Sequence, residues 1–186
     1  MEFFRESVQR VRRKRQIQLT EMSEFYLVNL LSEAVDTRKN PPDEPLALTY
    51  GRAMGTPSIG ERFTLMKQVG DRSLYVSGFF GDALSRMAVD VDYFIAMGVL
   101  AYDFVSSLAE EKKPDRGVAE MFEELSGKFA KLVDLFAEIS ASSGLTSDAD
   151  LLRVYERWLA TRNDRLRELL LEKGILPVDW KKGPLH

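Results

Sequence analysis

The chain contains no cysteine, and its only histidine is His186, the last residue of the sequence. Without cysteine the protein forms no disulfide bond, holds no metal ion through thiolates and has no cysteine nucleophile. With a single histidine, we expect no Ser-His-Asp triad, no histidine general base and no histidine-ligated zinc site. The commonest routes to hydrolytic and zinc-dependent catalysis are therefore not expected.

Long hydrophobic runs are also missing. The longest apolar stretch without a charge covers residues 93–102, about half of the roughly 20 residues that a transmembrane helix needs. The first residues do not have the charged-then-apolar layout of a signal peptide. We therefore expect a cytoplasmic protein that does not span a membrane.

Motifs for nucleotides and metals are missing as well. The sequence has neither a Gly-x-x-x-x-Gly-Lys-Ser/Thr phosphate loop nor a dinucleotide fingerprint, and it lacks the Glu-x-x-His motifs of di-iron bundles. Acidic residues cluster at Glu120, Glu123 and Glu124, a pattern typical of a solvated helix start, where the helix dipole favours carboxylates. We expect no metal ion, no cofactor and no catalytic residue.

Hydrophobic periodicity and the positions of glycine and proline predict helices throughout. We expect helices over residues 20–35, 59–87 with a break near Gly70, 91–110, 115–142 and 146–173, and a short helical turn over residues 46–54. Thr20 and Asp90 are suitable N-caps. In the first helix Phe25, Val28 and Leu31 share one stripe, which predicts its buried face. Trp180 is expected to pack the C-terminal tail against the domain.

The fold class follows from these elements. No alternating strand pattern occurs, and four of the seven prolines fall between residues 36 and 60. We predict an all-α protein: an antiparallel bundle of about five helices with a long Pro/Gly-containing connection after the first. A basic N-terminal helix or arm (residues 1–19) precedes a single helical domain (residues 20–186). Apolar residues at alternating spacings of three and four predict a packing seam, formed by Phe122, Leu125, Phe129, Leu132, Phe136 and Ile139.

The N-terminal arm carries most of the positive charge. Residues 1–15 hold six basic and two acidic side chains, while the whole chain has a net charge of −3. The basic run over residues 10–15 is compatible with a solvated helix, with contact to nucleic-acid phosphates, or with an anionic protein or membrane surface. Because no DNA-binding motif accompanies it and the rest of the chain is acidic, we do not expect nucleic-acid binding.

Residues 72–108 combine charge with unusually apolar surroundings, which makes them the strongest candidate for a site. Charged groups in such a setting need partners, because burying an unpaired charge is costly. We expect a buried cluster between the two central helices, contributed by Arg72, Tyr75, Asp82 and Arg86 on the first and by Asp92, Tyr93, Tyr102 and Asp103 on the second.

A fold-back between these helices near residues 88–90 would bring opposite charges together. It places Arg86 opposite Asp92, and Tyr75 opposite Asp103 with Arg72 one turn away. Two interpretations stay open: a structural network that fixes helix packing, or a polar pocket in which an arginine faces an anionic ligand group.

Two functions are compatible with this sequence. The first is a non-enzymatic helical protein that acts through protein–protein contact, as a homo-oligomer or with another protein. We expect this function because the catalytic motifs sought above are missing and the helices have an excess of apolar surface. The second is a helical bundle, sensor or enzyme-like, that binds a small polar ligand at the eight residues named above.

Overall fold

A computed structural model describes residues 2–35, 45–86, 90–111 and 116–142, together with Tyr155, Trp158, Arg167, Glu168, Leu170 and Leu171. In these residues every regular element is a helix and no strand occurs, so the all-α prediction is confirmed. The elements are α1 (Glu2–Lys14), α2 (Glu21–Val35), α3 (Leu46–Gly55), α4 (Ile59–Arg86), α5 (Val91–Glu111), α6 (Arg116–Gly127) and α7 (Phe129–Ser142).

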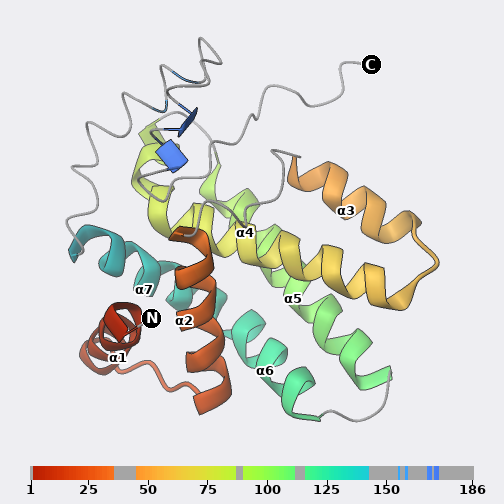
Figure 1. The fold of residues 1–186 in the computed structure, drawn as a ribbon, viewed down its shortest axis with the longest axis horizontal. Coiled ribbons are helices and arrows are strands. Elements are labelled where there is room, and N and C mark those ends of the chain that lie inside the picture. The colour runs from red at the N-terminus through yellow and green to blue at the C-terminus, as the bar shows by residue number, and fades with distance from the viewer. Residues whose placement is uncertain are drawn as a thin grey trace.

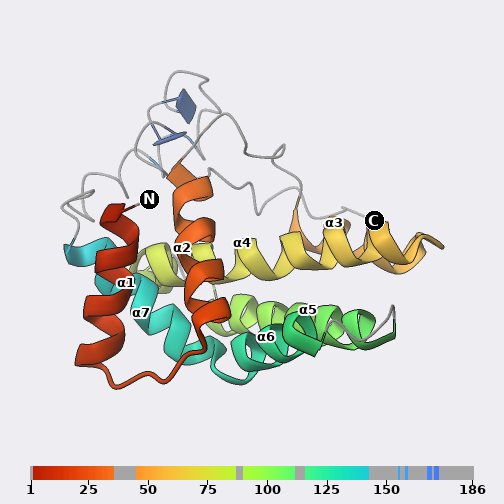
Figure 2. The same ribbon diagram turned by 60° about the horizontal axis from the view of Figure 1, so that its bottom comes forward.

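The centre of the bundle is the pair α4 and α5. Helix α5 folds back along α4, α6 packs against α5, and α7 packs against α4 (Figures 1 and 2). Helix α3 lies along the outer side of α4. At the other end α1 and α2 stand side by side, with α1 descending and α2 ascending in Figure 2, and α1 also contacts α7. The two N-terminal helices therefore close one end of the central layer.

Polar side chains mark the helix starts. Thr20 accepts a hydrogen bond from the backbone N–H of Ser23 at 3.2 Å, and Asp90 accepts one from the N–H of Asp92 at 2.9 Å. Each bond satisfies one of the N–H groups that a helix start leaves without an intrahelical partner. The predicted caps of α2 and α5 are both confirmed.

Two predicted boundaries are wrong. Helix α4 runs without a break through Gly70, where the absent side chain makes room for the ring of Tyr102. The single helix expected over residues 115–142 is two helices, divided at Lys128. The division lets α6 follow α5 while α7 turns toward α4.

The core confirms the seam predicted for residues 122–139. All six seam residues are at most 2% exposed. The apolar stripe continues from α6 into α7, and both helices turn it toward the core. Phe129 packs so closely on Gly98 of α5 that any side chain there would overlap its ring. On α2 the buried stripe is Leu27, Val28 and Leu31, whereas Phe25, expected inside, is 65% exposed.

Helix α5 is the one described helix that is long and apolar enough to cross a membrane by length and composition alone. In this fold it packs against α4 and α6, and Phe94, Ala101, Tyr102 and Val105 are at most 1% exposed. One face of α5 therefore belongs to the core, while most of its apolar window stays outside the core.

Most of the helix expected over residues 146–173 and the tail at Trp180 lie outside the described residues. Those described there are helical, and Tyr155, Trp158 and Leu170 are buried.

Candidate functional site

A buried carboxylate, Asp71 of α4, organises the polar centre of the bundle. Tyr102 of α5 donates a hydrogen bond to its Oδ1 at 2.8 Å, and Tyr26 of α2 donates a second to the same atom. The Lys67 ammonium, one helical turn before Asp71, lies 2.7 Å from Oδ2. The Asp71 cluster (Tyr26, Lys67, Asp71 and Tyr102) therefore joins three helices through one side chain that is 9% exposed as a residue.

The electrostatics of the Asp71 cluster keep its tyrosines protonated. Burial, and then the charge of Asp71, raise the pKa of Tyr26 and of Tyr102 well above the usual value. The Lys67 ammonium lies 5.0 Å from the centroid of the Tyr26 ring, a cation–π geometry. Both hydroxyls therefore act as donors to the carboxylate throughout the physiological pH range.

The surroundings of the Asp71 cluster are closely packed. The ring centroid of Phe122 lies 5.3 Å from that of Tyr26 and 5.4 Å from that of Tyr102. A side chain at Gly70 would overlap the Tyr102 ring. Three donors satisfy Asp71, and aromatic rings pack around the cluster. The arrangement is therefore typical of a buried polar network that holds helices together.

The expectation that Asp92 and Asp103 are buried is wrong. Both are exposed, and the side chain of Asp103 is turned away from α4, while its neighbour Tyr102 occupies the inner position. The buried acid comes from α4 instead, as Asp71. The physical reason is that a tyrosine can bury its ring and still satisfy its hydroxyl, which costs less than burying a second carboxylate.

The described site residues other than Tyr102 differ in burial and lie outside the Asp71 cluster. Tyr75 is buried and stacks on Phe79, with ring centroids 4.7 Å apart, whereas Asp103 is exposed. Arg72 is partly buried, and Tyr93 is 44% exposed. The side chains of Asp82 and Arg86, and with them the pairing of Arg86 with Asp92, lie outside the described residues. Of the eight predicted residues, the structure places Tyr102 alone in the Asp71 cluster.

Sequence reasoning missed Tyr26 and Asp71, and it did not place Lys67 beside a buried carboxylate. The spacing of Lys67 and Asp71, four residues apart on one helix, is a recognisable ion-pair pattern. Nothing in the sequence singles out Tyr26, because its contact with Asp71 spans 45 residues. The sequence does not show how each helix is rotated about its own axis, and this rotation decides which side chains meet.

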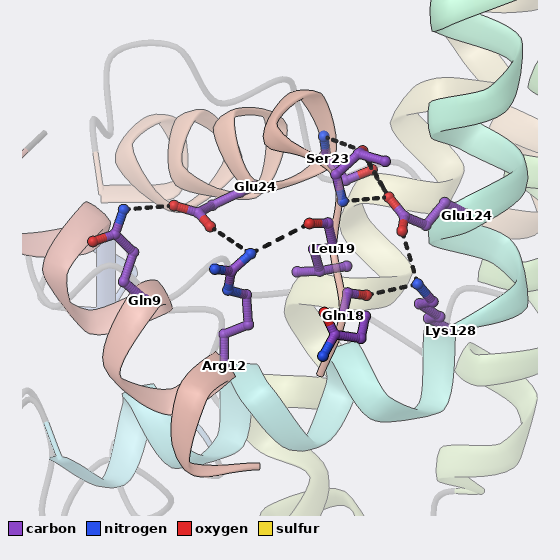
Figure 3. A network of polar contacts seen from close by, with 9 residues as sticks. Gln9, Arg12, Gln18, Leu19, Ser23, Glu24, Glu124 and Lys128 are labelled. Atoms are coloured by element: carbon purple, nitrogen blue, oxygen red, sulfur yellow. Dashed lines mark hydrogen bonds and ion pairs between the residues drawn. The ribbon is translucent and has the colours of Figure 1, made fainter. Parts of the chain in front are cut away.

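A second polar network ties the N-terminal helices to the bundle (Figure 3). Glu124 of α6 accepts hydrogen bonds from the backbone and hydroxyl of Thr20, at 3.0 and 2.8 Å, and from the hydroxyl of Ser23 at 2.5 Å. Lys128, at the turn between α6 and α7, contacts Glu124 at 2.7 Å and the carbonyl oxygen of Gln18 at 2.6 Å. One carboxylate thus fixes the start of α2.

Glu124 has a strongly perturbed acidity. Partial burial raises the pKa of its carboxyl group, but hydrogen bonds from Lys128, Ser23 and Thr20 together outweigh burial and lower the pKa to about 2. The carboxylate therefore stays charged far below neutral pH. Its role, like that of Asp71, is to hold helices together.

Three of the five basic side chains of residues 10–15 form ion pairs within the molecule: Arg12, Lys14 and Arg15. Glu138 of α7 lies 2.5 Å from Lys14 and 2.6 Å from Arg15, and Arg15 also pairs with Asp134 at 3.3 Å. Hydrogen bonds from Lys14 and Arg15 lower the pKa of Glu138. These pairs offer the arginines and the lysine an alternative to phosphate contacts.

Between α1 and α2 lies an open cleft with a volume of about 680 Å³. Three of its lining residues contact one another: the guanidinium of Arg12 lies 3.1 Å from Glu24, and Gln9 donates a hydrogen bond to Glu24 at 2.7 Å (Figure 3). Charged residues from both helices line the rest of the cleft, together with Phe25.

The outer side of α5 carries an apolar row that the chain leaves half open. Four large side chains recur at spacings of four, three and four residues, and we call them the α5 seam: Tyr93, Met97, Leu100 and Phe104. Tyr93 is 44% and Leu100 46% exposed, and the other two are partly buried. Only 39% of the most apolar window of α5 is buried. Such spacing is that of a helix-packing seam.

Groups of three or more His, Cys, Asp or Glu side chains that could hold a metal ion do not occur among the described residues. Comparisons with protein-family models, with curated protein sequences and with solved structures found no match to this chain. Any functional conclusion therefore depends on the chain's own geometry.

Proposed function

We propose that this protein acts without catalysis of its own, through protein–protein contact, and that its partner is a second copy docked on the α5 seam. The observation that carries the proposal is the seam itself: apolar side chains at helix-packing spacing, two of them about half exposed. Large apolar side chains in a continuous row favour burial in an interface.

The seam suits a two-fold symmetric contact. If two α5 helices meet antiparallel with the axis near Ala96, Tyr93 of each copy lies against Leu100 of the other, as an isologous interface requires. Ala96, which is small and exposed, lies beside the axis at the edge of the seam. At 100° per residue the exposed acids of α5 lie on one edge of the seam, so they would remain in a solvated rim.

The alternative, a small polar ligand held between the central helices, has less support. The Asp71 cluster already supplies each oxygen of its carboxylate with a donor. Packing of Gly70 against Tyr102 fills the space beside it. A ligand there would have to displace existing contacts, whereas a second copy on α5 would only add contacts.

A pair of charge substitutions tests the proposal. Leu100→Glu places a carboxylate in the seam, and Leu48→Glu on α3 is the matched control, because both leucines are 46% exposed. We expect size-exclusion chromatography with light scattering to give a dimer for the wild type and for Leu48→Glu, and a monomer for Leu100→Glu. A dimer that survives Leu100→Glu would place the interface elsewhere.

A further inference from the structure

Helices α1 and α2 are tied to each other by polar contacts of their own. The guanidinium of Arg12 pairs with Glu24 and donates a hydrogen bond to the carbonyl oxygen of Leu19 at 3.3 Å, and Gln9 also binds Glu24 (Figure 3). These contacts join the two helices and the segment between them without using the other helices. We call residues 2–35, which stand side by side at one end of the bundle in Figure 2, the N-terminal cap.

The attachment of α1 to α7 includes ion pairs at the surface. Lys14 and Arg15 both pair with Glu138, and Arg15 also pairs with Asp134. The side chains of Lys14, Arg15 and Asp134 are each at least 40% exposed. Ion pairs with such exposed members are individually weak and are screened by salt, because water and mobile ions compete for the same charges.

The attachment of α2 to α4 and α6 is polar as well. Glu124 of α6 accepts hydrogen bonds from Thr20 and Ser23 at the start of α2, and Asp71 of α4 accepts one from Tyr26. Water can replace each of these donors when α2 moves away. A hydrogen bond exchanged for one to water contributes much less net free energy than the same bond in isolation.

Contacts among α4, α5 and α7 are of another kind. Three glycines on α4 and α5 are covered so closely by an aromatic side chain of a neighbouring helix that an added methyl group would overlap it: Gly70 by Tyr102, Gly78 by Phe136 and Gly98 by Phe129. Residues 2–35 contain no glycine, so the cap has no contact of this type. Water does not replace the dispersion contacts that such close packing provides.

We propose that the N-terminal cap separates from the other helices as one unit while α4, α5 and α7 stay packed, and that the surface ion pairs control how often it does so. The cap also buries apolar side chains in the common core, among them Val8, Val11 and Leu27, so the closed form predominates. Proteins open in cooperative units of this kind at free energies below that of global unfolding. Higher ionic strength weakens the ion pairs and therefore raises the open population.

Opening of the cap uncovers groups that the closed protein hides. Phe122 of α6 is 2% exposed, and its ring centroid lies 5.3 Å from that of Tyr26 in the cap. The carboxylates of Asp71 and Glu124 lose their donors from the cap and become available to other donors. The cap is thus a reversible cover over an aromatic ring and two carboxylates, and it is separate from the α5 seam, which is accessible in the closed form.

Single cysteines test the proposal, because the chain has none of its own. Ser7→Cys on α1 and Ser73→Cys on α4 place a thiol at two buried serines, which are 4% and 0% exposed. With iodoacetamide under native conditions, we expect Ser7→Cys to react at least roughly tenfold faster than Ser73→Cys. Raising sodium chloride from about 20 mM to about 500 mM should accelerate labelling of Ser7→Cys by roughly threefold or more and leave that of Ser73→Cys unchanged.

Charge variants in the Ser7→Cys background identify the cause of opening. Glu138→Gln should raise the labelling rate at low salt to roughly the rate seen at high salt. Glu120→Gln, which removes an exposed acid from α6, is the matched control and should leave the rate unchanged. Circular dichroism checks that each variant is folded. Equal labelling rates for Ser7→Cys and Ser73→Cys, or a rate that responds neither to salt nor to Glu138→Gln, would overturn the proposal.

Hydrogen-exchange mass spectrometry of the unmodified protein completes the test without any substitution. We expect peptides from α1 and α2 to exchange faster than those from α4 and α5, and to accelerate together when the salt concentration rises. Acceleration confined to α1 would show that this helix frays alone. That result, or equal protection of all four helices, would also overturn the proposal.

Discussion

Replacing Asp71 with alanine should destabilise the protein strongly. The substitution removes the acceptor shared by two buried hydroxyls, those of Tyr26 and Tyr102. A buried polar group left without a partner costs about 1–3 kcal/mol, whereas loss of the Lys67 contact adds little, because that side chain is 35% exposed. We expect Asp71→Ala to lower the free energy of unfolding by about 3 kcal/mol.

Urea denaturation followed by circular dichroism measures this change. Asp103→Ala is the matched control: Asp103 is exposed, and replacing a solvated aspartate changes stability by under about 0.5 kcal/mol. Asp71→Asn should fall between the two, because its amide oxygen can still accept from both hydroxyls, whereas its NH2 group replaces the oxygen that Lys67 contacts. If Asp71→Ala unfolds at the same urea concentration as Asp103→Ala, the cluster does not hold α2, α4 and α5 together.

Three further substitutions follow from the packing and the charges. Gly98→Ala should destabilise the protein by about 1–3 kcal/mol, because its methyl group would overlap the ring of Phe129. Gly51→Ala has open space around it and should stabilise the protein by up to about 1 kcal/mol. Thermal melts that rank the two variants in the opposite order would contradict the packing. The pKa of Glu124 is lowered from 4.5 to about 2, so the stability that its charge contributes to the fold is present above pH 4.5 and is lost as the pH falls toward 2. Glu124→Gln should lower the free energy of unfolding by about 1–2 kcal/mol at neutral pH, which is less than the full pKa shift implies because solvent screens the pair. At pH 2 the loss of stability should be much smaller, and an equal loss at both pH values would refute the assignment.

The helices themselves were predictable because their signals are local. Thr20 and Asp90 precede apolar periodic segments, and both cap helices as expected. The residues of the 122–139 seam recur at three and four residues, and all are buried. The same regularity hid the turn at Lys128, since the stripe continues from α6 into α7 without a change in spacing.

The site was not predictable because it depends on how helices are rotated. Helix α5 is apolar nearly all the way round, so its pattern does not select which face points inward. The predicted register used Arg72 and Asp103, whereas the structure uses their neighbours Asp71 and Tyr102. An offset of one residue turns a helical side chain by about 100°, which is enough to exchange a buried aspartate for a solvated one.

Phe25 illustrates a related limit. Its spacing to Val28 and Leu31 suits a buried stripe, yet it is 65% exposed. The spacing permits burial without requiring it, because Leu27 completes the inner face of α2 instead. An exposed aromatic of this kind becomes visible only when the neighbouring helices are in place.

The most direct test of self-association through α5 uses the absence of cysteine from the chain. In Ala96→Cys the only thiol lies beside the proposed two-fold axis, and a disulfide forms only when the two Cα atoms come within about 7 Å. Under mild oxidation we predict rapid, nearly complete conversion to a disulfide-linked dimer, while Ser107→Cys, three turns along the same exposed side of α5, stays largely monomeric. If Ala96→Cys crosslinks no faster than Ser107→Cys, the two copies do not meet at the α5 seam.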